Sequence, residues 1–179
     1  MATEQSFAAI TSFDATFGKT AFPYFGGGVQ VVVMDGFFVE ATASRFRQTG
    51  QRAYVSGGKS FQLGIPLTAT ITALEIGAGY RFRVPQLPRV RPYAAIGYGS
   101  YAYTETSEFA EPGDDVDTKH GGYLVNGGAE FRLHRWIGFA VDVQYTRVPG
   151  ILGNGGVSQQ AGESDLGGLA GRFKLVVGR

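Results

Sequence analysis

Apolar and polar side chains alternate with a period of two along most of the chain. In the clearest stretch, residues 137–146, Ile, Phe, Val, Val and Tyr at the odd positions alternate with Gly, Ala, Asp, Gln and Thr. Residues 169–177 repeat this pattern, and an α-helix there would place Arg172 and Lys174 on its apolar side. The alternation therefore predicts β-strands with one apolar face and one small or polar face.

The same alternation predicts eight strands and no helix. Residues 41–47 are the one competing helical stretch, and they are too short and too closely bracketed by β-like sequence to form a helix alone. Residues 92–104 are strand-like but ambiguous in face, because Tyr93, Tyr101 and Tyr103 share one parity while Ile96 and Tyr98 share the other. In chain order, the expected strands lie near residues 7–17, 25–33, 37–43, 74–82, 92–104, 123–133, 137–145 and 169–177.

Short and long connections alternate between these strands. The short ones lie at 34–36, 84–91 and 134–136, and the long ones at 48–66, 105–119 and 148–165. This is typical of an up-and-down meander whose two ends face different compartments. We therefore expect one domain, 1–179, of the all-β class: an eight-stranded antiparallel transmembrane β-barrel with short turns on one side and long loops on the other.

The 48–66 connection shows signs of being a hairpin. Residues 52–55 and 60–65 alternate around Ser56-Gly57-Gly58-Lys59. Strands from about 37 to 55 and from 60 to 82 would exceed the ~10 residues that cross a bilayer. We expect this hairpin to stand clear of the membrane and to offer Tyr54, Val55 and Phe61 to a protein partner or a second copy.

The polar parity indicates which face points inward. It carries many of the small residues and a balanced set of charges, and glycine, at 28 of 179 residues, weakens strands without serving a solvent-exposed face. A narrow barrel has little room inside and must pair every charge that it encloses. We therefore expect a charged lumen formed by Glu40, Glu75, Arg81, Glu130, Arg132, Asp142, Arg172 and Lys174. The alternative is a soluble, lipocalin-like barrel of reversed parity that binds a small hydrophobic ligand.

The apolar parity has candidate membrane-interface residues at both ends. Aromatic side chains are expected in two interfacial girdles, with Tyr80, Phe82, Tyr93 and Trp136 beside the short turns and Tyr101, Tyr103, Tyr123 and Tyr145 near the long loops. Ordinary core positions are the alternative. At the long-loop end, the same parity continues into cations that are candidate contacts for lipid headgroups, lipopolysaccharide included, or simply solvated strand ends: Arg45, Arg47, Lys119 and Arg147.

In architecture, the whole chain resembles the small outer-membrane β-barrel family of the OmpA, OmpX and opacity-protein type. The resemblance is clearest in the residue pattern of the stretches 23–33, 91–103, 121–133 and 136–145. The resemblance implies a structural or surface-interaction role in the bacterial outer membrane through the long loops. In the family the last strand usually ends in an aromatic residue, whereas this chain ends in Arg179.

Little in the sequence favours catalysis. Lipid-modifying barrels use Ser with His and a carboxylate, but His120 is followed by two glycines and His134 has no neighbouring Ser. A lipid-modifying enzyme is therefore the minor alternative, and we expect no catalytic residues, no cofactor and no metal site. A net charge of +1 without a basic run argues against nucleic-acid binding, and the chain has no Cys.

The apolar residues are too dispersed for a membrane-spanning helix. They make up 44% of the chain, yet no stretch approaches 18 uninterrupted apolar residues. Residues 1–5 also lack the basic and apolar regions of an export signal. We therefore expect either a cytoplasmic protein or, in the barrel interpretation, a mature chain whose signal has been replaced by Met1.

Overall fold

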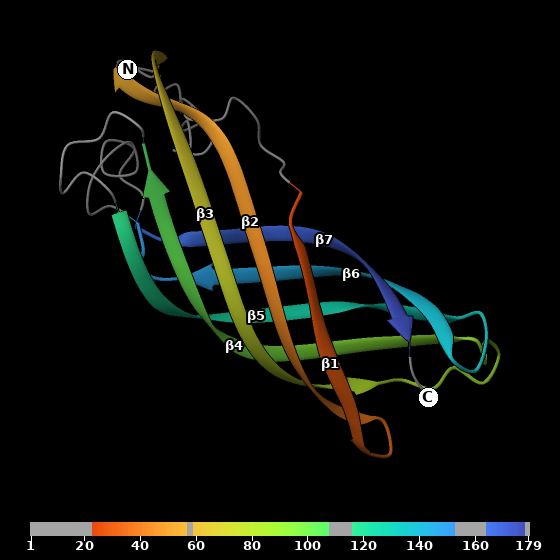
Figure 1. The fold of residues 1–179 in the computed structure, drawn as a ribbon. Helices are drawn as coiled ribbons and strands as arrows, with labels where there is room; N and C mark the ends of the chain where they lie inside the picture. The colour runs from red at the N-terminus through yellow and green to blue at the C-terminus, as the bar shows by residue number, and fades with distance from the viewer. Residues whose placement is uncertain (1–22, 57–58, 108–115, 153–163, 178–179) are drawn as a thin grey trace, which may run out of the picture.

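The computed structural model describes residues 23–56, 59–107, 116–152 and 164–177, which form one antiparallel sheet (Figure 1). Each strand pairs with its neighbour in the sequence. No helix in these residues is long and apolar enough to cross a membrane. The seven strands are β1 (Phe25–Met34), β2 (Phe37–Ser56), β3 (Lys59–Arg81), β4 (Val90–Thr106), β5 (Val116–Arg132), β6 (Ile137–Val148) and β7 (Leu166–Val177).

The sheet is open between β1 and β7 in the described residues, so the expected closed barrel of eight strands is not seen in full. The all-β meander and seven of the predicted strands are confirmed. The strand predicted at 7–17 lies outside the described residues and stays a prediction. Figure 1 shows the sheet strongly curved, with β1 and β7 as its two edges.

The short connections lie at one end of the sheet and the long ones at the other. Asp35 and Gly36 make the β1–β2 turn with φ of 30° and 97°, values that suit a tight hairpin with positive φ at both central residues. Residues 82–89 and 133–136 connect β3 to β4 and β5 to β6 at the same end. We call this the short-turn end and the opposite one the loop end.

The predicted long hairpin is confirmed. β2 and β3 stay paired from Phe37↔Tyr80 to Ser56↔Lys59, with one register shift between Gln51 and Ala53. In the described residues, β1 pairs with β2 only as far as Arg45, and β4 pairs with β3 only as far as Thr68. Residues 50–56 and 59–67, which lie beyond the pairing with both β1 and β4, therefore form a two-stranded extension, which we call the ribbon. Phe61 and Leu63 are exposed on it, whereas the side chains of 52–60, with Tyr54 and Val55 among them, lie outside the described part.

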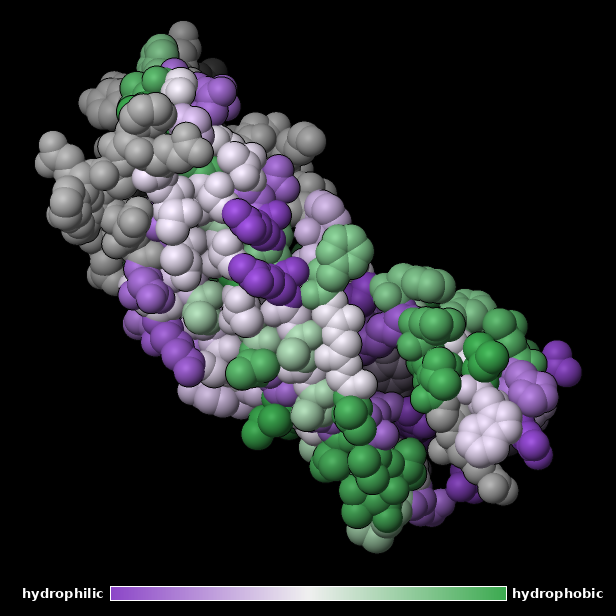
Figure 2. All heavy atoms as spheres, in the orientation of Figure 1, coloured by the Kyte–Doolittle hydropathy of each residue, from purple (hydrophilic) through white to green (hydrophobic). Residues whose placement is uncertain are grey.

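The two faces of the sheet differ in the way that the parity predicts. Large apolar side chains point outward, among them Ile76 at 68% exposure and Phe173 at 73%, while Glu130 and Asp142 are each 2% exposed on the inner face. Figure 2 shows hydrophobic side chains gathered toward the short-turn end, with pale and hydrophilic ones toward the loop end. Outward apolar and inward charged residues are the reverse of a lipocalin-like barrel.

Two apolar clusters also pack on the inner face. Phe38 packs with Tyr93, Ala95 and Ala140 near the short-turn end. A methyl group added at Gly79 would lie 2.5 Å from Cζ of Phe38, so this inward glycine makes room for the ring. The second cluster lies toward the loop end and comprises Ala69, Ala73, Tyr101, Tyr103, Val148, Ile151 and Leu152.

Candidate functional site

Asp142 on β6 is the centre of the inner polar network. The register places it opposite Arg172 on β7, whose Nη2 lies 3.0 Å from Oδ2 of Asp142. Lys174, two residues farther along β7, brings its Nζ to 2.8 Å from the same oxygen. Tyr93 on β4 donates its hydroxyl to Asp142 as well. One buried carboxylate thus accepts hydrogen bonds from two cations and a phenol.

Glu130 on β5 forms a second centre. Oε2 of Glu130 lies 3.2 Å from Nη2 of Arg81 on β3, and Oε1 lies 2.8 Å from Nε of Arg132. Arg81 also donates to the side chain of Gln30 on β1, and its guanidinium lies 5.6 Å from the ring centre of Phe38. All four inward cations predicted from parity therefore gather around two of the four predicted acids.

The other two acids, Glu40 and Glu75, are held by neutral donors. Glu75 accepts hydrogen bonds from Thr42 at 3.0 Å, Tyr101 at 2.8 Å and Gln144 at 3.0 Å. Glu40 accepts one from Asn126 at 3.1 Å. Neither forms an ion pair among the described residues. Parity places the eight charges on the inner face, but it does not predict this uneven pairing.

The neutral members of the network are the residues that sequence reasoning missed as a group. Gln30, Thr42, Asn126 and Gln144 lie on the inward parity of their strands, which is the one signal in the sequence that marks them. Gln144 also accepts a hydrogen bond from Arg172, so it joins the Asp142 centre to Glu75. The bonds from β6 to β3 and from β5 to β2 connect strands that are not neighbours in the sheet.

A half-open cavity of about 1410 Å³ lies along the inner face of the curved sheet and opens at the gap between β1 and β7. Gly27, Gln30, Leu169 and Lys174 are among its lining residues on the two edge strands, and Glu40 and Glu75 line its interior. Figure 2 shows the notch between the two edges. The hydrogen-bonded layer crosses this cavity, and the apolar cluster around Tyr101 and Val148 lies toward its loop end.

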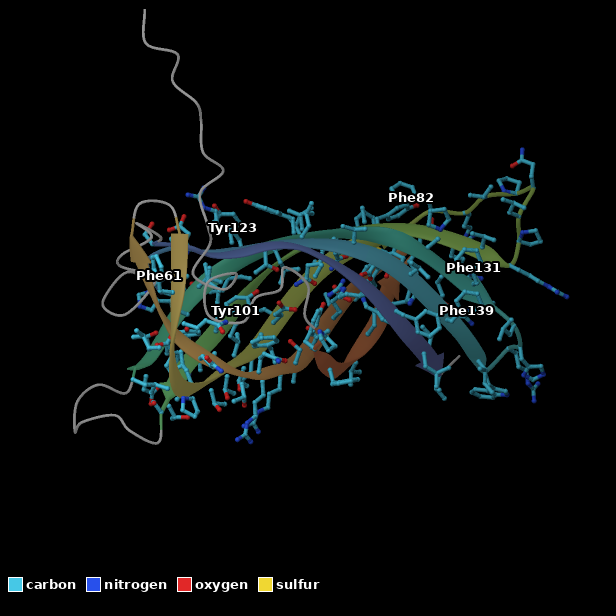
Figure 3. All side chains as sticks on the ribbon, turned by 90° about the horizontal axis from the view of Figure 1, so that it is seen from above. Phe61, Phe82, Tyr101, Tyr123, Phe131 and Phe139 are labelled. Carbon is cyan, nitrogen blue, oxygen red and sulfur yellow. The ribbon has the colours of Figure 1, made fainter. Side chains whose placement is uncertain are left out.

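Outward aromatic residues gather toward the short-turn end, and Figure 3 shows Phe131 beside Phe139 there, with Phe82 in the same half of the sheet. The ring centre of Tyr80 lies 4.9 Å from that of Phe37 and 5.1 Å from that of Phe82. Phe139 stacks on Phe131 with their ring centres 4.9 Å apart. Trp136 is half exposed beside Arg135. Toward the loop end, Tyr98, Tyr123 and Tyr145 are the outward aromatics on β4, β5 and β6.

The assignment of Tyr93, Tyr101 and Tyr103 to the outer girdles was wrong. All three are buried on the inner face, where Tyr93 donates to Asp142, Tyr101 to Glu75 and Tyr103 to Glu105. Ile96 and Tyr98 take the outward face of β4 instead. The physical reason is that the hydroxyl of a buried tyrosine can donate a hydrogen bond to a carboxylate on the inner face. Ile96 has no polar group and gains nothing there.

The four cations predicted at the loop end all lie on outward positions, but they differ in pairing. Arg147 binds Asp165 through Nε at 2.9 Å and Nη2 at 2.7 Å. Hydrogen bonds from Arg147 hold the pKa of Asp165 below its usual value. Among the described residues, Arg45, Arg47 and Lys119 form no ion pair. Arg147 is therefore already neutralised by the chain itself.

The two histidines are separated in the fold. His120 lies on β5 opposite Tyr101, and His134 lies in the β5–β6 turn, where its backbone bonds with Ile137. Within the described ranges, no group of three or more His, Cys, Asp or Glu side chains is placed to hold a metal ion.

Comparison with known protein families gives a match over most of the chain. The family model for the outer membrane protein beta-barrel domain matches residues 6–167. No curated protein and no solved structure matches the chain. The matched range spans all of β1 to β6 and includes the stretch in which an additional N-terminal strand is predicted.

Proposed function

This chain belongs to the outer membrane protein beta-barrel family, and on that premise we propose that it is a closed, internally plugged barrel of the bacterial outer membrane, without enzymatic activity, that presents its ribbon to the outside. The observation that carries the proposal is the inversion of the two faces: apolar side chains cover the outer face while ion pairs fill the inner one. This arrangement suits a lipid surround and a narrow interior.

Strand direction supports an eighth strand. Each of the seven strands is antiparallel to the next one in the chain, so β1 and β7 run in the same direction. They therefore cannot pair with each other in antiparallel fashion. Open strand edges do not persist in the hydrocarbon region, because each unpaired backbone group there costs several kcal/mol. One strand between β1 and β7, antiparallel to both, satisfies both edges. Residues 7–17, with Phe7, Phe13 and Phe17 in phase, are the segment of the chain that we assign to this position.

The inner layer supports a structural role in place of a wide pore. Side chains from β2, β3, β5 and β6 meet across the interior, and an apolar cluster lies toward the loop end. An eight-stranded barrel is just wide enough for side chains to fill it. We therefore expect at most a low conductance, and a role carried by the outer surface and the ribbon.

No specific observation favours the two rival functions. A lipocalin-like binder would place its apolar residues inside, where this chain has Glu130 and Asp142. A lipid-modifying enzyme would need a serine, a histidine and a carboxylate joined by hydrogen bonds, whereas among the described residues Ser164 bonds to Asp165 and neither His120 nor His134 makes a side-chain hydrogen bond to a serine or a carboxylate.

Extraction and electrophoresis test the proposal. The full chain, exported with a signal, should fractionate with outer membranes, need detergent for extraction and migrate differently on gels before and after boiling. Recovery in the aqueous fraction with no heat-dependent mobility shift would overturn the membrane assignment.

Planar-bilayer recordings test the plugged interior. We expect the wild type to show at most a low conductance, and Arg172→Ala with Lys174→Ala to increase it by removing two side chains of the inner layer. The matched control is Arg147→Ala with Asp165→Ala, which removes an exposed ion pair at the loop end and should leave the conductance unchanged. A wild type as conductive as a wide porin would contradict the plug.

A further inference from the structure

We propose that the outer face of β2 and β3 binds the phosphorylated headgroup of an outer-leaflet glycolipid. The binding surface lies on the loop-end side of the outward apolar side chains of these two strands. The surface consists of Arg45, Arg47, Thr49, Thr68, Thr70 and Thr72, and we call it the β2–β3 plate. The proposal rests on the proposed function, since it needs a barrel set in a lipid leaflet, and it names the ligand class that this part of the outer surface takes.

The sheet register assembles the plate in cross-strand rows. Arg45 lies opposite Thr72 and Arg47 opposite Thr70. In the next row, Oγ1 of Thr49 lies 3.0 Å from Oγ1 of Thr68. Side chains opposite each other on one face of an antiparallel pair are close neighbours. Two guanidinium groups and four hydroxyls therefore share one outward surface.

The plate begins where the apolar band ends. The outward pairs below it are Ala41↔Ile76 and Ala43↔Leu74, and Ile76 and Leu74 are both well exposed. The next outward pair is Arg45↔Thr72, so the face changes from apolar to polar within a single step. In a barrel, this change marks the level at which the hydrocarbon gives way to headgroups.

The charge of the plate is free to meet an anion. Residues 41–74 contain four cations and no acid, and neither Arg45 nor Arg47 forms an ion pair with another described residue. Farther along the same outer face, on β6, Arg147 is neutralised by Asp165. The structure thus replaces the predicted set of four equivalent cations by a localised site on two strands.

A third cation extends the same surface. The row from Arg45 through Thr72 continues to Ala102 on β4 and Lys119 on β5. Lys119 is exposed, and the outward neighbours on β4 are small: Ser100, Ala102 and Thr104. A ligand lying along the row can therefore reach Lys119 from Arg45 without meeting a large side chain on β4.

The chemistry of the plate suits a phosphorylated sugar. A guanidinium can bind two phosphate oxygens at once, and cations near a membrane surface attract anionic headgroups. Threonine hydroxyls both donate to phosphate or sugar oxygens and accept from sugar hydroxyls. The plate offers few apolar anchors, which are the groups that dominate protein–protein interfaces, so a headgroup fits it better than a protein partner does.

The test compares two forms of one lipid. Purified barrel in a zwitterionic detergent is titrated with diphosphoryl lipid A and with fully dephosphorylated lipid A. We expect the wild type to bind the phosphorylated form more tightly, and Arg45→Gln with Arg47→Gln to lose about tenfold in affinity for that form alone. Arg45→Lys with Arg47→Lys should retain part of the affinity, because lysine keeps the charge but not the two-pronged geometry.

Controls separate this inference from the proposed function. Arg89→Gln with Arg135→Gln removes the same charge from the short-turn end and should bind lipid A like the wild type. Each variant is first shown to have the heat-dependent mobility of a folded barrel. If that shift is present but the wild type binds both lipids equally, or the double Gln variant binds like the wild type, the plate is not a phosphate site. If the wild type lacks the shift, the barrel proposal itself fails.

Discussion

Asp142 is the single residue on which the inner network depends most. Its carboxylate is buried and accepts from Arg172, Lys174 and Tyr93, which come from two different strands. Removing one member of a buried ion pair is costly because it leaves the partner's charge buried and uncompensated. Two cations depend on Asp142 in this way.

Asp142→Asn should lower the free energy of unfolding by about 3–5 kcal/mol, since Arg172 and Lys174 lose their shared carboxylate. Urea titration of the barrel in detergent, followed by the heat-dependent gel shift, measures the change. Asp165→Asn is the matched control because it breaks the exposed pair with Arg147, and exposed pairs contribute little. If the two substitutions lowered the free energy of unfolding equally, the inner ion pairs would contribute no more to stability than the exposed one.

At the residue scale, the sequence predicts faces better than it predicts partners. Period-two alternation places Glu40, Glu75 and Asp142 on the inner face, where the structure has them. It cannot show that Glu75 meets Gln144, because that contact joins strands that are not neighbours and depends on how the sheet curves. Tyr93 is misplaced for a different reason: an amphipathic phenol fits either face, so parity alone does not fix its side.

Among the strands, β2 and β3 differ most from a simple membrane-crossing element. They have 20 and 23 residues, against the roughly 9–11 needed to cross a bilayer. Their mutual pairing continues beyond the last pairs that β1 forms with β2 and that β4 forms with β3. The hairpin was predictable because its strand pattern surrounds a glycine turn. The register shift between Gln51 and Ala53 has no counterpart in the sequence pattern.

Replacing residues 51–66 by Asn-Gly, which joins the paired Gly50 and Leu67, should shorten the ribbon without harming the barrel. The free energy of unfolding should change by less than about 1 kcal/mol, because loop length contributes little and the barrel pairing below is kept. Heat-dependent mobility and urea titration measure this. Loss of the folded band would show that the ribbon is part of the barrel's own support.

In the whole molecule, the two edge strands of the described sheet, β1 and β7, determine what the rest of the chain must supply. Both edges run in the same direction, so the seven described strands need one more antiparallel strand to close a barrel. The alternation in residues 7–17 predicts that strand, but much more weakly than in 137–145, because only Phe7, Thr11, Phe13 and Phe17 are in phase there.

Deletion of residues 2–19 should abolish the heat-dependent mobility shift, because both edges would then stay unpaired in the membrane. Deletion of residues 2–5, which precede the range matched by the family model, is the matched control and should leave the shift intact. A folded barrel from the longer deletion would mean that β1 and β7 close the structure without an additional strand.

The neighbour-by-neighbour pairing of the strands also has a consequence for the rate of assembly. Each of the six pairings from β1 to β7 joins strands that follow each other in the chain, so each closes a loop that is far shorter than the whole chain. Closing the proposed barrel instead brings together segments from the two ends of the chain, and the entropy lost on closing a loop grows with its length. We expect this one long-range event to limit the rate of folding, as non-local pairing does in other β proteins. In the proposed barrel, the junction between residues 7–17 and β7 should then be the last part to form and the first to separate.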